Sequence, residues 1–123
     1  MPLIKLNRRG QGVGDGPVGY LLSSTDHKGN ERDPLPEILS GEPFITIAAI
    51  DSSEFKHRYI SGTIAYSIDD APTFKQQKQA MEDCEALWFA GIDNYKERIP
   101  ILWVRHEDKD RVELNFVIPR IDL

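Results

Sequence analysis

Cysteine is nearly absent from this sequence, and so are long hydrophobic runs. The one cysteine among the 123 residues, Cys84, excludes an internal disulfide, and its place on the apolar side of a predicted helix favours a buried structural thiol. The most apolar stretch, Ile45 to Ile50, is far shorter than the ~20 residues of a membrane-spanning helix. The first residues contain no apolar segment ending in a small-residue cleavage site, so we expect a cytoplasmic protein.

Positive charge is also in short supply. The 15 Lys and Arg residues against 20 Asp and Glu residues give a formal charge of −5, which argues against a protein that coats nucleic acid. The charge is unevenly spread, because Lys5, Arg8 and Arg9 all precede the first acidic residue, Asp15. A basic patch beside an acidic body is therefore compatible with the sequence.

The length suits a single domain with one packed core. Residues Pro2 to Leu6 are predicted to form a strand, which runs into a glycine-rich loop from Gly10 to Gly16. This loop has no lysine in the P-loop arrangement, so a flexible connection is favoured over a phosphate cradle. Pro17 suits a first helical position, and Val18 to Leu22 is predicted to open a helix with Tyr20 just inside it.

The next part of the chain mixes clear and ambiguous patterns. Polar, proline-punctuated residues from Ser23 to Pro36 predict a surface loop, followed by a short turn at Glu37 to Gly41. The stretch Phe44 to Asp51 is compatible with a strand or a helix. Aromatic and β-branched residues from Tyr59 to Ile68 predict a strand.

An amphipathic helix is predicted from Thr73 to Phe89, with Thr73 as its cap. Its apolar residues at helical spacing are Phe74, Met81, Cys84 and Trp88. Two further strands are predicted at Pro100 to His106 and Arg111 to Ile118, joined by the hairpin loop Glu107 to Asp110. The fold class expected is α+β, an antiparallel sheet with packed helices.

His106, Glu113 and Asn115 share one face of this hairpin if His106 lies opposite Glu113. Their β-carbons would then be within about 5 to 8 Å of one another, whereas a slip of one residue would separate them. One imidazole and two oxygen ligands suit Mg²⁺ or Mn²⁺. From the spacing alone, the simpler interpretation is favoured, in which Glu113 and Asn115 are the solvent-facing half of an amphipathic strand.

The spacing of these residues, seven from His106 to Glu113 and two more to Asn115, resembles that of a known metal triad. That known triad belongs to the HEN (His-Glu-Asn) class of plasmid mobilization relaxases, which this chain resembles. Other blocks of the chain are also similar to the family and stand in the family's order. Gly16 to Leu22 resembles the segment that bears the nucleophilic tyrosine. The other blocks are Tyr59 to Gly62, Leu102 to His106 and Glu113 to Pro119. Together they span nearly the whole chain.

The resemblance implies a relaxase (HUH endonuclease-like) domain that nicks one DNA strand at a plasmid transfer origin in the bacterial cytoplasm. Tyr20 would be the nucleophile and form a 5′-phosphotyrosyl link, with Mg²⁺ or Mn²⁺ held by His106, Glu113 and Asn115. The implied partners are single-stranded origin DNA, accessory mobilization proteins and a conjugative coupling protein. The basic residues considered as DNA contacts are Arg8, Arg9, Lys56 and Arg58.

The sequence departs from the family pattern in two places. Gly19 stands where many members have an acidic residue, which leaves open how the tyrosine is activated. Relaxase domains usually continue beyond the triad strand, so we expect residues 1 to 123 to be a single catalytic domain that lacks its C-terminal part. Two alternatives remain: a non-catalytic module that binds single-stranded or hairpin DNA, and a metal-stabilised structural protein in which Tyr20 has no purpose.

Overall fold

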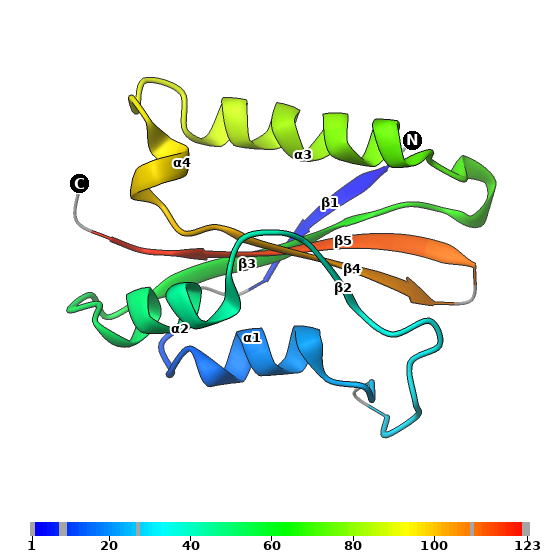
Figure 1. Cartoon of the computed structure of the whole chain (residues 1–123), viewed down its shortest axis with the longest axis horizontal. Coiled ribbons are helices and arrows are strands. Elements are labelled where there is room, and N and C mark those ends of the chain that lie inside the picture. The colour runs from blue at the N-terminus through cyan, green and yellow to red at the C-terminus, as the bar shows by residue number, and fades with distance from the viewer. Residues whose placement is uncertain (1, 8–9, 27, 109, 122–123) are drawn as a thin grey trace.

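A computed structural model describes residues 2–7, 10–26, 28–108 and 110–121 (Figure 1). The strands are β1 (Leu3–Leu6), β2 (Glu37–Ser40), β3 (Tyr59–Ala65), β4 (Leu102–Asp108) and β5 (Arg111–Pro119). The helices are α1 (Asp15–Leu22), α2 (Pro43–Asp51), α3 (Phe74–Trp88) and the short α4 (Tyr95–Arg98), with a 3-10 turn at Ile68–Asp70. No helix in these described ranges is long and apolar enough to span a membrane.

The strands form one open sheet in the order β1-β3-β5-β4-β2, and every neighbouring pair is antiparallel. Figure 1 shows α3 and α4 on one face of this sheet and α1 and α2 on the other. The predicted α+β class is therefore confirmed. Helices cover both faces because the central strand β5 and its neighbour β4 carry apolar residues on both sides.

Two hydrophobic clusters flank the sheet. The cluster beneath α3 contains Trp103 and Phe116, the two largest of the fully buried side chains, together with Leu114, Met81 and Cys84. The cluster on the opposite face consists of Val18, Leu21, Ile50, Leu102, Val104 and Val117. Even-numbered residues of β4 and odd-numbered residues of β5 therefore point towards α1 and α2.

The structure corrects the turn prediction for one segment and decides another that the sequence left open. Glu37 to Gly41 is not a turn: Glu37–Ser40 forms the edge strand β2, which pairs with β4 and adds an ion pair of 2.9 Å between Glu37 and Arg105. The ambiguous stretch after it is a helix, α2. Its N-cap is Glu42, whose carboxylate accepts a hydrogen bond of 2.9 Å from the backbone N–H of Ile45.

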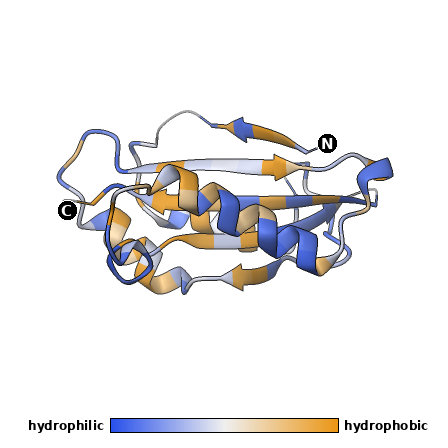
Figure 2. Cartoon of the chain, turned by 90° about the horizontal axis from the view of Figure 1, so that it is seen from above, coloured by the Kyte–Doolittle hydropathy of each residue, from blue (hydrophilic) through white to orange (hydrophobic). Residues whose placement is uncertain are grey.

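The long helix follows the prediction except at its first residue. Thr73 forms the capping box with Gln76, and Met81 and Cys84 lie in the core. Phe74, predicted on the apolar side, is 70% exposed, because it stands in the first turn, where the helix has not yet reached the core. Figure 2 shows hydrophilic and hydrophobic residues alternating along α3, as expected for a helix with one face in solvent.

Candidate functional site

The register of the β4–β5 hairpin brings the predicted triad to one face. His106 lies opposite Glu113, and Asn115 lies opposite Val104, one diagonal step away. This face is covered by α1. His106 is 5% exposed and Asn115 is 6% exposed, whereas Glu113 is half-buried. The simpler interpretation, in which Asn115 points to solvent, is therefore wrong.

Both imidazole nitrogens of His106 have hydrogen-bond partners. Nε2 lies 2.7 Å from the carbonyl oxygen of Leu21, and because a carbonyl only accepts, Nε2 carries the proton. Nδ1 lies 3.0 Å from a guanidinium nitrogen of Arg32 and must be the acceptor. Burial lowers the pKa of His106, and the Arg32 charge also lowers it, against the opposing effects of the Leu21 carbonyl and Glu113. The ring is therefore held neutral, in the Nε2–H form.

The amide of Asn115 is oriented by its neighbours. Its Nδ2 faces the backbone carbonyls of Val104 and Glu113 at 3.3 and 3.4 Å and can only donate to them. Its Oδ1 accepts a hydrogen bond of 2.8 Å from the hydroxyl of Thr63, on the neighbouring strand β3. A carbonyl oxygen has a second lone pair, so Oδ1 keeps the capacity to bind a cation.

The donor set fits a hard divalent cation. It offers one neutral imidazole nitrogen, one carboxylate and one amide oxygen, which suit Mg²⁺ or Mn²⁺ with remaining positions for water or phosphate oxygens. The Nε2–H of His106 donates to a backbone carbonyl, the usual outer contact of a metal-binding histidine. Within the described residues, no group of three or more His, Cys, Asp or Glu side chains gathers to hold an ion. The third member of this set is an amide.

Tyr20 lies on the same face as the triad. It is 47% exposed on α1, and the carbonyl of the next residue, Leu21, is the partner of His106. The guanidinium carbon of Arg32 lies 5.3 Å from the centre of the Tyr20 ring. The same side chain therefore contacts both Tyr20 and His106.

Arg32 is the residue that sequence reasoning missed. It belongs to the loop between α1 and β2, in a polar stretch with no periodicity to single it out. The loop is ordered by an isolated bridge between Thr25 and Glu31 and by a hydrogen bond of 2.7 Å from the backbone N–H of Arg32 to Ser24. The only signal in the sequence is a cation in a loop that follows the tyrosine-bearing helix.

Of the four predicted DNA contacts, the two that the structure describes, Lys56 and Arg58, lie away from this face. Arg8 and Arg9 lie outside the described residues. Lys56 and Arg58 precede β3, whose first residue pairs with Pro119, whereas its last residue, Ala65, pairs with Glu113. Since a strand rises about 3.3 Å per residue, these cations lie roughly 20 Å along the sheet from the triad. They are candidates only for contact with more distant nucleotides.

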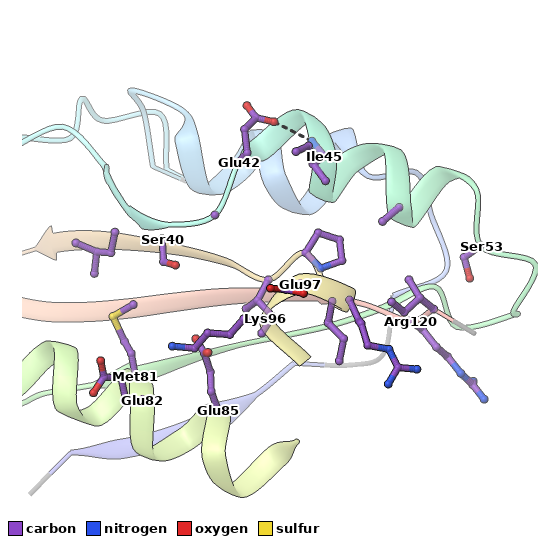
Figure 3. Close-up of a pocket in the computed structure, with 18 of the residues that line it drawn as sticks. Ser40, Glu42, Ile45, Ser53, Met81, Glu82, Glu85, Lys96, Glu97 and Arg120 are labelled. Atoms are coloured by element: carbon purple, nitrogen blue, oxygen red, sulfur yellow. Dashed lines mark hydrogen bonds between the residues drawn. The ribbon is translucent and has the colours of Figure 1, made fainter. Parts of the chain in front are cut away.

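A large cleft lies elsewhere. Figure 3 shows it between the start of α2, with Glu42 and Ile45, and the helices α3 and α4, with Glu85 and Lys96. None of Tyr20, His106, Glu113 and Asn115 lines it. Its buried carboxylate, Glu85, accepts a hydrogen bond of 2.8 Å from the indole N–H of Trp103 and so serves the core. The chemistry-bearing residues instead lie on the sheet face beside α1.

Two curated proteins are similar to the chain over nearly its whole length. A protein named cryptic plasmid protein C, from Neisseria gonorrhoeae, is 38% identical over 122 residues, which are 98% of this chain and 55% of that protein. The DNA relaxase MbeA of Escherichia coli is 37% identical over 122 residues, which are 22% of its length. The chain thus spans about half of the first relative and about a fifth of the second. No family model and no solved structure matches it.

Proposed function

Since this chain is a relative of plasmid mobilization relaxases, we propose that it is a nuclease domain of the His-Glu-Asn class. The domain would nick one DNA strand at a plasmid transfer origin and remain attached to the new 5′ end. One observation carries this proposal. The helix that bears Tyr20 is tied to His106 through the 2.7 Å contact at Leu21, on the face where Glu113 and Asn115 also lie.

The chemical step would be a transesterification at one phosphodiester. The phenol oxygen of Tyr20 attacks phosphorus, the bond from phosphorus to the 3′ oxygen breaks, and the leaving 3′ oxygen takes up a proton. A neutral phenol is a weak nucleophile, so its proton has to pass to a base or to solvent during the attack. The phosphotyrosyl link conserves the diester, and the reverse reaction can rejoin the strand without ATP.

The triad would supply charge stabilisation. A Mg²⁺ or Mn²⁺ ion bound to Nδ1 of His106, to Glu113 and to Oδ1 of Asn115 would act as a Lewis acid for the phosphate oxygens. The protein's own contribution is to orient these ligands. The Leu21 carbonyl keeps Nδ1 of His106 free of a proton, and Thr63 with two backbone carbonyls holds the Asn115 amide.

The partners of this activity follow from the proposal. Single-stranded origin DNA would reach the Tyr20 face, and its more distant phosphates would meet Lys56 and Arg58. Arg8 and Arg9 remain predicted contacts. Accessory mobilization proteins and a coupling protein in the bacterial cytoplasm are expectations that rest on the family resemblance.

The decisive test replaces Tyr20 with Phe, which removes one oxygen and retains the ring. The parent protein is incubated with Mn²⁺ and a labelled oligonucleotide that contains the cognate nick site, and the products are separated by denaturing electrophoresis. We expect a covalent protein–DNA band with the parent and none with Tyr20→Phe. Binding of the intact oligonucleotide should survive, because phosphate and stacking contacts do not need the hydroxyl. An equal band from both proteins would assign the nucleophile to another tyrosine, such as Tyr59.

A second candidate is a DNA-binding module without catalysis. It is favoured by the contact of Arg32 with Nδ1 of His106, which occupies the lone pair that a metal ion would need. The same experiment separates the two candidates, because a pure binding module gives no covalent band on a verified site.

A further inference from the structure

Arg32 contacts both Tyr20, the proposed nucleophile, and His106 of the triad. We propose that it is a substrate-contacting residue of the nicking site, which rests on His106 in the free protein and binds the scissile phosphate once a divalent ion takes its place. The inference rests on the proposed function. It adds a residue that neither the triad nor the tyrosine motif contains, and it gives the contact with His106 a role.

The contact of Arg32 and metal binding at His106 exclude each other. Nε2 of His106 carries the proton, because its partner, the carbonyl oxygen of Leu21, can only accept a hydrogen bond. Nδ1 is therefore the only ring nitrogen with a lone pair for a metal ion. That lone pair accepts the 3.0 Å hydrogen bond from Arg32. An ion at Nδ1 would also face the guanidinium charge at close range. The Arg32 side chain therefore has to leave the ring when an ion binds.

The guanidinium has an unused donor in the free protein. Its second terminal nitrogen is buried and has no hydrogen-bond partner among the described residues, while Nε makes a 3.3 Å bond to the carbonyl of Thr25. A buried donor without a partner is costly, and a phosphate oxygen would satisfy it. The planar fork of arginine matches two phosphate oxygens, which a point charge does not.

The contact with Tyr20 indicates which phosphate Arg32 would bind. The guanidinium carbon is 5.3 Å from the centre of the ring, so a side chain that leaves His106 but keeps this contact would hold an anion beside Tyr20. A phosphate that touches both Tyr20 and an ion on His106 would lie near the guanidinium, because Arg32 contacts both residues. No other described cation touches both residues.

The first measurement is the affinity for Mn²⁺ in the absence of DNA. The electron paramagnetic resonance signal of the free ion reports how much Mn²⁺ is unbound. The parent is compared with Arg32→Gln and with Arg105→Gln, which removes a neighbouring charge on the opposite face, where Arg105 pairs with Glu37. Loss of one competing hydrogen bond is expected to tighten Mn²⁺ binding by about tenfold in Arg32→Gln. Arg105→Gln should change it much less. Equal Mn²⁺ affinities of the parent and Arg32→Gln would overturn the proposal that an ion displaces Arg32 from His106.

The second measurement is oligonucleotide binding in the Tyr20→Phe background, which prevents cleavage. With Mn²⁺ present, adding Arg32→Gln should weaken binding and reduce the salt dependence of log K by about 0.7, the value for one lost phosphate contact with a single strand. Arg32→Lys keeps the charge and should retain the salt dependence while losing part of the affinity. An unchanged affinity and salt dependence in Arg32→Gln would overturn the proposal.

His106→Ala separates this inference from the proposed function. If His106→Ala leaves Mn²⁺ binding unchanged, the metal assignment fails, whatever Arg32 does. If His106→Ala weakens Mn²⁺ binding but Arg32→Gln weakens it too, the metal site stands and Arg32 is a structural support instead. Thermal unfolding of each variant shows whether it is folded. If Arg32→Gln is not folded, Arg32→Lys is compared with the parent in its place.

Discussion

At the residue scale, His106 links stability to pH. Burial lowers the pKa of His106 in the folded protein, while the unfolded chain keeps the ordinary value near 6.5. The unfolded state therefore binds more protons on acidification, so this contribution is present above pH 6.5 and is lost as the pH falls through the folded pKa. We expect the free energy of unfolding of the metal-free protein, measured in urea, to fall between pH 7.5 and pH 5. His106→Gln should show a smaller fall, and an identical pH profile would contradict the assignment.

The members of the triad should differ in their effect on nicking. Glu113→Ala removes the charged member of the proposed ligand set and is expected to abolish Mn²⁺-dependent nicking of supercoiled plasmid, as is His106→Ala. Asn115→Ala should be milder, because an amide oxygen contributes less charge to the ion. His106→Ala also leaves the Leu21 carbonyl and Arg32 without their partner, at a cost of about 1 to 3 kcal/mol for each buried group. Nicking has therefore to be compared at a temperature where circular dichroism shows every variant folded.

At the scale of the elements, the position of α1 depends on one glycine of the loop before it. A β-carbon on Gly14 would lie 2.8 Å from the Cα of Ile47 in α2, and the N–H of Gly14 donates a 2.7 Å hydrogen bond to Asp51. Gly14→Ala should push α1 and α2 apart, cost about 1 to 3 kcal/mol in urea unfolding, and reduce covalent adduct formation by displacing Tyr20. Gly12 is the matched control, since a β-carbon added there would meet no atom within 4 Å. Equal loss in Gly12→Ala would point to loop flexibility instead of packing.

At the scale of the whole molecule, metal binding should stabilise the fold. The triad joins β4 and β5 beneath α1, so an ion that binds only the folded state shifts the unfolding equilibrium. Mn²⁺ at about 100 times its Kd corresponds to roughly 2.7 kcal/mol, or about 10 °C in Tm for a domain of this size. Differential scanning calorimetry with and without EDTA measures the shift. We expect none in His106→Ala, and an equal shift there would place the ion at another site.

The sequence alone determined the features that follow from periodicity. Strand alternation places every second residue on one face, so His106, Glu113 and Asn115 could be assigned to a common face once the hairpin was recognised. The α+β class and the capped helix after Thr73 were predicted for the same local reasons. The edge strand β2 was not, because four residues with little burial carry almost no pattern, and their structure depends on pairing with β4.

Only the tertiary structure decided how α1 and its following loop meet the triad. Leu21 and Arg32 reach His106 across 85 and 74 residues of sequence, and such contacts depend on helix packing and the path of a loop, which no spacing encodes. The burial of Asn115 has the same origin, since α1 covers a face that alternation alone would leave in solvent. The sequence predicted which side chains form the triad. The packing of α1 determined which nitrogen of His106 carries the proton.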